Sequence, residues 1–123
     1  MRKEIVTSNA PTAIGAYSQG IESSGTVFTS GQLPIDPCTN TMASEISEQT
    51  KQSLENIKAI LRQAGKDFSN VVKTTVFLDD MNSFDEMNEV YKEYFSKPFP
   101  VRTCVAVKAL PKNAKVEIEV IAE

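Results

Sequence analysis

The residues best suited to chemistry lie near the end of the chain, in the runs VRTCVAV and KVEIEVIA. Both runs are rich in β-branched residues and predict two closing strands. Because side chains alternate along a strand, Arg102 and Cys104 lie on one face of the first strand. Glu117 and Glu119 likewise share one face of the second strand. If the valines and isoleucines of both strands face the helices, all four polar side chains share the face that the helices leave uncovered.

An arginine on such a face is suited to binding a carboxylate, because its planar guanidinium makes two parallel charge-assisted hydrogen bonds. A nearby glutamate could then orient a water molecule or transfer a proton. The simpler alternative is an ion pair between Arg102 and Glu117 across neighbouring strands, and the spacing by itself favours this alternative. Cys104 fits best as a small buried apolar residue, since the chain has no histidine that could activate its thiol.

Four further residues could line a binding site, and each also has a simpler structural explanation. Tyr17 would ordinarily be a packing residue whose hydroxyl is hydrogen-bonded. Asn88 falls beside the apolar face of a predicted helix, where its amide could anchor the backbone or contact a ligand. Ser30 and Gly31 end a predicted strand, where a glycine either lets a ligand approach the backbone or turns the chain. The residue types alone do not decide between these alternatives.

The composition narrows the classes of function. The 123 residues include no histidine, which removes Ser-His-Asp and Cys-His catalysis and most zinc sites. A net charge of -3 with scattered lysines and arginines disfavours nucleic-acid binding, which relies on a basic surface. Cys38 and Cys104 form no CxxC pair, so we expect a reducing cytoplasm and no disulfide framework. No segment approaches the roughly 20 apolar residues of a membrane-spanning helix, so no membrane association is expected.

The length fits one domain over residues 1–123. The stretch from Ile46 to Ala64 has the three- and four-residue spacing of an amphipathic helix, with Gly65 as its cap. Ser83 with Glu86 resembles a capping box that opens a second helix. The predicted elements in chain order are strands at 2–7, 17–22 and 26–30, an ordered loop at 31–44, a helix at 46–64, a strand packed on both sides at 71–78, a second helix from Ser83 that Lys97–Pro100 ends, and strands at 101–107 and 115–122.

This order of elements predicts an α+β fold of two layers, in which a mixed β-sheet carries both helices on one face. The other face of the sheet then needs a cover. For so short a chain, self-association into a homo-oligomer is the simplest cover.

Several segments of the chain carry the motifs of a known family in the family's order. They are NAPTAIGAYSQG, FTSGQLPIDP, SLENIKAIL, VVKTTVFLDDM, MNEVYKEYF, FPVRTCVAV and LPKNAKVEIEVIA. From about Asn9 to Ala122 the sequence resembles the RidA/YjgF family of reactive-intermediate deaminases. The SGQ, PxR and LPxxAxVEIE motifs are each weak evidence for the family when found alone, but together they are highly specific for it.

The resemblance implies a chorismate-mutase-like fold assembled as a homotrimer, with the sheets packed into a central barrel and the sites in clefts between subunits. It implies a hydrolase acting on C=N bonds, a 2-iminobutanoate/2-iminopropanoate deaminase. Such an enzyme converts reactive 2-imino acids and their enamine tautomers to 2-keto acids and ammonia. No metal or organic cofactor is expected, and the partners implied are the small 2-imino acid and further copies of the chain.

The family's functional residues carry over by position. Arg102 matches the arginine that binds the substrate carboxylate, and Glu117 matches the acidic residue associated with the hydrolytic water. The positions that match the remaining lining of the pocket are Tyr17, Ser30, Gly31, Asn88 and Cys104. Glu119 sits on the same strand face as Glu117, and no role is assigned to it.

Two positions depart from the family pattern. Ala16 replaces the proline of IGPYSQ, which would loosen the loop that carries Tyr17. Asn40 replaces a glycine that closes a turn, and because asparagine tolerates left-handed geometry, the turn is expected to survive. Two other functions stay open. One is an endoribonuclease or translation inhibitor, a role attributed to some family members, and the other is a non-catalytic small-metabolite binder that uses the same cleft.

Overall fold

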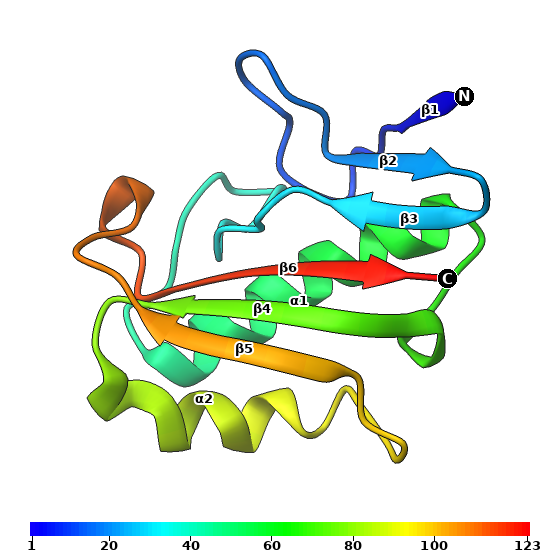
Figure 1. Ribbon diagram of the computed structural model, residues 1–123. Helices are drawn as coiled ribbons and strands as arrows, with labels where there is room; N and C mark the ends of the chain where they lie inside the picture. The colour runs from blue at the N-terminus through cyan, green and yellow to red at the C-terminus, as the bar shows by residue number, and fades with distance from the viewer.

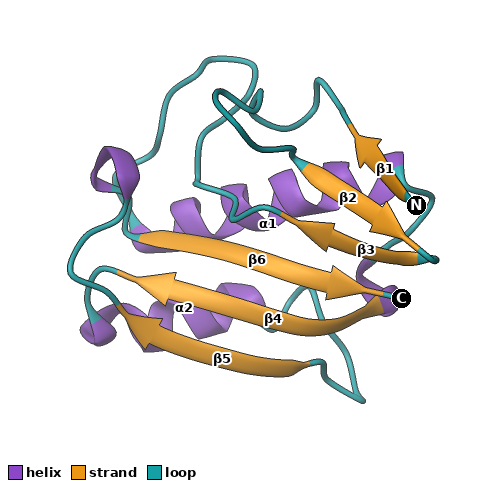
Figure 2. Cartoon of the chain, turned by 45° about the horizontal axis from the view of Figure 1, so that its top comes forward, coloured by secondary structure: helices purple, strands orange, loops and turns teal.

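Six strands form one mixed sheet, and two helices lie against one of its faces (Figures 1 and 2). The computed structural model describes residues 1–123. The strands are β1 (Arg2–Ile5), β2 (Gly20–Ser23), β3 (Thr26–Thr29), β4 (Val71–Leu78), β5 (Val101–Ala106) and β6 (Val116–Ala122), and the helices are α1 (Ile46–Gln63) and α2 (Phe84–Tyr91). Across the sheet the order is β1-β2-β3-β6-β4-β5, and only β4 and β5 run parallel. The predicted α+β fold, with a mixed sheet and two helices, is confirmed.

The apolar core forms between the sheet and α1, because one stripe of this helix is apolar. Leu54, Ile57 and Leu61 are fully buried in one cluster with Ile118 of β6. Each such side chain stabilises the fold by about 1.5–3 kcal/mol relative to its exposed state. Gly65 follows the helix with a φ of +74°, a left-handed conformation that glycine adopts without strain, so its predicted place at the cap is confirmed. Neither α1 nor α2 combines the length and the apolar character of a membrane-spanning helix.

β4 has the predicted bounds, but the chain covers only one of its faces. Val76 and Leu78 are fully buried on the side of the helices, whereas Phe77 on the other side is half-buried. Phe77 is opposite Val105 of β5 and Glu117 of β6, so these residues share the face turned away from the helices. We call this the open face; Figure 2 shows both helices behind the sheet. The prediction of a strand packed on both sides is wrong for a single chain.

The strand predicted at 17–22 begins only after Gln19, so Tyr17 lies in a loop. The Gln19 side chain ties this loop to the preceding segment. Its amide nitrogen donates to the Pro11 carbonyl oxygen at 2.8 Å, and its oxygen accepts from the Thr7 N–H at 2.8 Å. These bonds satisfy backbone groups of Thr7 and Pro11, which lie outside the strands.

The loop predicted at 31–44 is held by a side chain of α1 and by a hydrogen bond of its own. Asn56 of α1 is fully buried and donates to two carbonyl oxygens of the loop, at 3.0 and 2.9 Å. Asn40 adopts a left-handed φ of 58°, and its N–H donates to the Asp36 carbonyl oxygen at 2.7 Å. The expected survival of this turn, despite the missing glycine, is therefore confirmed.

The capping box predicted at Ser83 does not form. A short 3-10 turn, Met81–Ser83, precedes α2, and Ser83 already has helical backbone angles. Its side chain makes no capping hydrogen bond. Asp80 caps the combined segment instead, because its side chain accepts a hydrogen bond from the Asn82 N–H at 2.9 Å. The helix ends at Tyr91, before the proline-rich segment that was predicted to stop it.

Candidate active site

Arg102 lies on the face of the sheet opposite to the predicted one. In the register of β4 and β5, Arg102 is opposite Thr74 and Cys104 is opposite Val76. Thr74 and Val76 are fully buried on the side of the helices. Glu117 lies on the open face. The prediction that Arg102 and Cys104 share a face with Glu117 is therefore wrong.

The error comes from the valines of β5. Val101 and Val105, which were predicted to face the helices, are 66% and 41% exposed. β5 is an edge strand, and its other face carries an arginine against the polar and aromatic side of α2. An alternating pattern separates the two faces of a strand without saying which of them is covered. Glu117 and Glu119, on β6, do lie on the open face as predicted.

Three side chains of α2 contact the Arg102 guanidinium. Asn88 Oδ1 accepts a hydrogen bond from Arg102 Nη1 at 2.7 Å. Arg102 Cζ lies 4.7 Å from the centroid of the Tyr91 ring and 5.4 Å from that of the Phe84 ring. Both distances are within the range of cation–π attraction. We call Phe84, Asn88, Tyr91 and Arg102 the arginine cluster.

Phe84 and Tyr91 are not among the site residues predicted from the sequence. Their spacing with Asn88 is i, i+4 and i+7, which places all three side chains on one face of a helix. That spacing was visible in the sequence. The missing information was that Arg102 of β5 lies against this face, and only the sheet register supplies it.

Cys104 lies next to the arginine cluster and has the properties of the predicted apolar residue. It is half-buried and packs against the core. Burial raises the pKa of its thiol, and the positive charge of Arg102 offsets only part of that rise. Because a thiol with a raised pKa is rarely ionised at neutral pH, the geometry gives no support to a nucleophilic role.

A second group of candidate residues lies around Gly31. The Ser30 hydroxyl donates to the Ser18 carbonyl oxygen at 2.5 Å. The Gln32 N–H donates to the Ile118 carbonyl oxygen at 2.7 Å, which lays this segment beside β6. We call Ser30, Gly31 and Glu117 the glutamate cluster.

Gly31 brings the backbone against the Glu117 carboxyl group. A Cβ atom at position 31 would lie 2.9 Å from Glu117 Cδ and 3.1 Å from its Cγ, closer than side chains ordinarily pack. The missing side chain at Gly31 therefore provides the space that the carboxyl group occupies. Tyr17 lies in the adjoining loop with 54% of its surface exposed, and its hydroxyl accepts a long hydrogen bond from the Ile14 N–H at 3.4 Å.

Glu117 has an unusual electrostatic environment. It is half-buried, and burial raises the pKa of its carboxyl group. Glu119, two residues away on the same face, raises that pKa further by charge repulsion. No ion pair offsets these effects, because the only one in the chain joins Lys92 to Glu89 at 2.9 Å. A carboxyl group with a raised pKa is better matched to proton transfer near neutral pH than an ordinary glutamate.

The arginine cluster and the glutamate cluster do not meet within one chain. Arg102 and Glu117 lie on opposite faces of the sheet, and β4 separates their strands. The alternative of an ion pair across neighbouring strands is therefore wrong. No group of three or more histidine, cysteine, aspartate or glutamate side chains is arranged to hold a metal ion. The arginine cluster is suited to binding an anion, and the glutamate cluster is suited to transferring a proton. Each therefore supplies only part of the chemistry of an active site.

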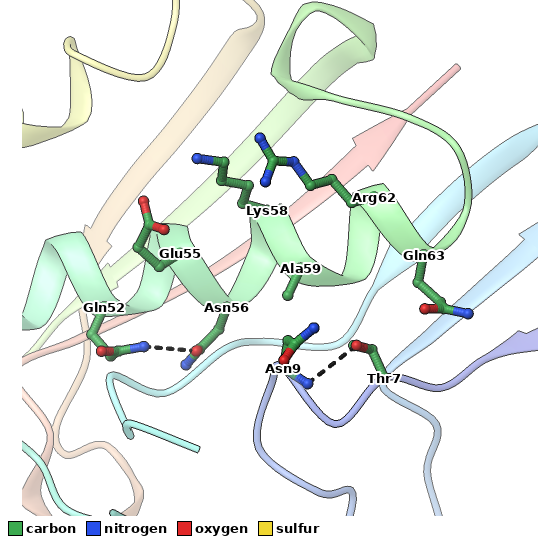
Figure 3. Close-up of a pocket in the computed structure, with 9 residues that line it drawn as sticks. All are labelled: Thr7, Asn9, Gln52, Glu55, Asn56, Lys58, Ala59, Arg62 and Gln63. Carbon is green, nitrogen blue, oxygen red and sulfur yellow. Dashed lines mark hydrogen bonds between the residues drawn. The ribbon is translucent and has the colours of Figure 1, made fainter. Parts of the chain in front are cut away.

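A hollow in the surface lies apart from both clusters (Figure 3). It has a volume of about 340 Å³ and lies between the outer side of α1 and the segment with Thr7 and Asn9. Its lining is mostly polar and includes none of the candidate residues. Figure 3 shows the charged ends of Lys58 and Arg62 on the side of α1 away from Asn9, so these cations do not converge with it on one ligand position.

The sequence matches a known family over nearly its whole length. A family model described as Endoribonuclease L-PSP matches residues 7–123, and the chain belongs to this family. The 2-iminobutanoate/2-iminopropanoate deaminase of Salmonella typhimurium is 50% identical over 125 residues, which cover 99% of this chain and 98% of the relative. The protein of the same name from Escherichia coli K12 is 46% identical with the same two shares. The resemblance to the RidA/YjgF family is confirmed.

Solved structures agree with this assignment. YyfA of the Rid protein family from Yersinia pestis superimposes with a TM-score of 0.96 at 48% identity, over 99% of this chain and 98% of that one. The E. coli protein TdcF, solved with bound serine, gives a TM-score of 0.93 at 46% identity, over 98% and 97% of the two chains.

Proposed function

We propose that this chain is a hydrolytic deaminase that converts 2-iminobutanoate, 2-iminopropanoate and their enamine tautomers to 2-keto acids and ammonia. The observation that carries the proposal is the Arg102 guanidinium. Asn88 of α2 holds this guanidinium through a hydrogen bond. The chain is 50% and 46% identical to two proteins named as deaminases of these substrates. A 2-imino acid places a carboxylate beside an electrophilic C=N carbon. It therefore needs one group that binds an anion and one that transfers protons.

Arg102 binds the substrate carboxylate in this proposal. Asn88 accepts a hydrogen bond from one N–H of the guanidinium, and the remaining N–H groups can donate to both carboxylate oxygens. Fixing the carboxylate also fixes the neighbouring C2 carbon, and orientation of this kind can lower a barrier by several kcal/mol, up to about 7–11. The rest of the pocket is lined by Tyr17, Ser30, Gly31, Asn88 and Cys104.

Glu117 handles the protons. In its ionised form it takes a proton from a water molecule as the water oxygen bonds to C2 of the N-protonated imine, whose nitrogen becomes an amine. The protonated Glu117 then returns the proton to this nitrogen as the C–N bond breaks, and the C2 hydroxyl releases its proton to solvent as it becomes the carbonyl of the keto acid. The products are the 2-keto acid and ammonia, and Glu117 ends in its starting form. A raised pKa suits a carboxyl group that must accept and release a proton in each turnover.

The site is completed between subunits of a homotrimer. Arg102 and Glu117 lie on opposite faces of one sheet, so a shared substrate requires them from different chains. The open face carries exposed apolar side chains, among them Phe28 and Val105, which a second and third sheet would cover. We propose a chorismate-mutase-like trimer with a central barrel of sheets and sites in the clefts between subunits. Each chain forms a single domain and acts in the cytoplasm.

A coupled assay tests the proposed activity. A pyridoxal-phosphate-dependent dehydratase generates the 2-imino acid, and formation of the 2-keto acid is followed with and without the purified chain. We expect the chain to accelerate this step. In analytical ultracentrifugation we expect a particle of three times the 13.5 kDa mass of one chain. An unchanged rate contradicts the proposal. A parallel RNA incubation identifies a nuclease if cleavage disappears in Arg102→Ala, and binding of imine without turnover identifies a sensor.

Gly31→Ala is expected to reduce the activity without unfolding the protein. Its new methyl group displaces the Glu117 carboxyl group, and a shift of about 1 Å in an active site can cost on the order of 100-fold. We therefore expect kcat/KM to fall by roughly 10- to 100-fold. The backbone at Gly31 is not left-handed, so alanine adds no backbone strain. Thermal melting of Gly31→Ala beside the wild type shows whether the variant stays folded, and a wild-type kcat/KM in the folded variant contradicts this role of Gly31.

Glu119→Gln is expected to shift the pH dependence of the reaction. Activity falls as the pH drops through the pKa of Glu117, because the protonated carboxyl group cannot accept a proton from water. Removing the charge of Glu119 lowers the pKa of Glu117 and moves this acidic limb of kcat/KM to lower pH. Glu93→Gln, at an exposed position, is the matched control. An acidic limb that stays in place in Glu119→Gln contradicts the electrostatic role of this neighbour.

A further inference from the structure

The arginine cluster contains two aromatic rings for which the proposed reaction has no chemical step. We propose that Phe84 and Tyr91 are positioning residues that fix the orientation of the Arg102 guanidinium before the substrate arrives. This inference rests on the proposed function, because it assumes that Arg102 binds the substrate carboxylate. It adds two residues to the site that neither bind nor transform the substrate themselves.

The geometry gives each contact a separate task. Arg102 Cζ lies 4.7 Å from the Tyr91 ring centroid and 5.4 Å from the Phe84 ring centroid. Asn88, one turn after Phe84 on the same helix face, accepts the hydrogen bond from Arg102 Nη1 at 2.7 Å. The rings thus hold the guanidinium by attraction of its charge, and Asn88 sets its rotation through one hydrogen bond. The side chain of Arg102 is otherwise exposed, with no carboxylate partner.

The Tyr91 ring is itself held in place. It is buried, and its hydroxyl lies 2.8 Å from the Thr74 hydroxyl in a hydrogen bond. Thr74 is fully buried and stands opposite Arg102 in the register of β4 and β5. On another side the ring packs against Phe95, with 4.5 Å between ring centroids. The core therefore fixes Tyr91, and Tyr91 in turn restricts Arg102.

A fixed guanidinium matters because arginine has a long and flexible side chain. An exposed arginine would have to lose rotamer freedom when the substrate binds, and that loss weakens binding. In this protein the two rings and Asn88 hold the guanidinium before the substrate binds. Arg102 therefore loses its rotamer freedom when the chain folds, and not when the substrate binds. Exposed cation–π contacts are weak, so we expect each ring to change the affinity for a carboxylate by about fivefold.

The test compares leucine substitutions that remove a ring. Phe84→Leu and Tyr91→Leu are expected to raise KM about fivefold each with little change in kcat. Tyr91→Phe keeps the ring and its packing against Phe95 but loses the hydrogen bond to Thr74, so its KM should rise less than that of Tyr91→Leu. Tyr94→Leu is the matched control, since Tyr94 follows α2, bonds to Glu55 and makes no contact with Arg102. Thermal melts establish that each variant is folded.

A second readout separates positioning from general packing. The product 2-oxobutanoate carries the carboxylate that Arg102 binds, and 2-oxobutanamide has the same skeleton without the charge. Loss of either ring should weaken inhibition by the acid about fivefold and leave inhibition by the amide unchanged. A merely structural role would weaken both inhibitors together, which overturns the inference.

The decisive variant is Phe84→Leu, because Phe84 is only half-buried and its loss disturbs the core least. Wild-type KM and acid inhibition in folded Phe84→Leu overturn the inference, whether or not Tyr91→Leu folds. The same conclusion follows if Tyr94→Leu raises KM equally. Arg102→Ala distinguishes this failure from failure of the proposed function: full activity in Arg102→Ala refutes the function itself. An inactive Arg102→Ala beside wild-type ring variants overturns only the positioning role.

Discussion

Arg102→Ala is expected to lower kcat/KM for 2-imino acid hydrolysis by about 10²–10⁴-fold. The estimate follows from the loss of two hydrogen bonds to a charged group, each worth ~1.5–3 kcal/mol, with about 1.4 kcal/mol for each factor of ten. The side chain is exposed in the single chain, so its removal should leave the melting temperature nearly unchanged. The measurement is the coupled imine assay, with stability followed by thermal melting.

Two further arginine variants sharpen this result. Arg102→Lys keeps the charge but loses the planar fork, so it should recover only part of the activity. Arg62→Ala removes an exposed arginine of α1 that contacts neither cluster, and it should behave as wild type. If Arg102→Ala and Arg62→Ala hydrolyse imines equally well, carboxylate binding by Arg102 is refuted.

Glu117→Gln is expected to lower kcat by at least about 100-fold with a smaller change in KM, because general acid–base catalysis typically contributes about 10²–10⁴-fold. Glutamine is nearly isosteric with glutamate and cannot take a proton from water. The measurement is steady-state kinetics of the imine assay at saturating and limiting substrate. An unchanged kcat excludes Glu117 as the proton-transferring group.

Stability provides the control for this variant. Folding raises the pKa of Glu117, so the folded protein disfavours its ionised form. The contribution of this group to stability is therefore greatest below its unfolded pKa and declines as the pH rises through its folded pKa. At neutral pH the neutral glutamine should melt no lower than wild type. A lower melting temperature would mean that lost activity reflects lost structure rather than lost chemistry.

The sequence predicted the long, regular elements well. The apolar stripe of α1 and the β-branched run of β4 each repeat over enough residues to define both the type and the bounds of the element. The start of α2 was predicted less well, because a capping box at Ser83 and a 3-10 turn before it use the same polar residues. Such local alternatives differ by single hydrogen bonds, which spacing does not resolve.

The candidate site shows where sequence reasoning fails for a physical reason. The motifs singled out Arg102 and Glu117 as candidates, and the predicted alternation of side chains in each strand is confirmed. The face of β5 was wrong because its valines lie on the open face, where this chain provides no cover. This sheet buries one face within the chain, and we propose that it buries the other face between chains. Apolar residues then occur on both faces, so their positions do not reveal which face the helices cover. Because Arg102 was assigned to the open face, its contacts with Phe84 and Tyr91 of α2 were not predicted.

Subunit complementation tests the central claim most directly, that Arg102 of one subunit and Glu117 of another act on the same imine. Arg102→Ala and Glu117→Gln chains, each inactive alone, are mixed in equal amounts, unfolded and refolded together. In a cyclic trimer with random mixing, about a quarter of the clefts combine an intact Arg102 with an intact Glu117. We predict recovery of about a quarter of the wild-type imine hydrolysis. No recovery in mixed trimers of normal mass would contradict a site shared between subunits.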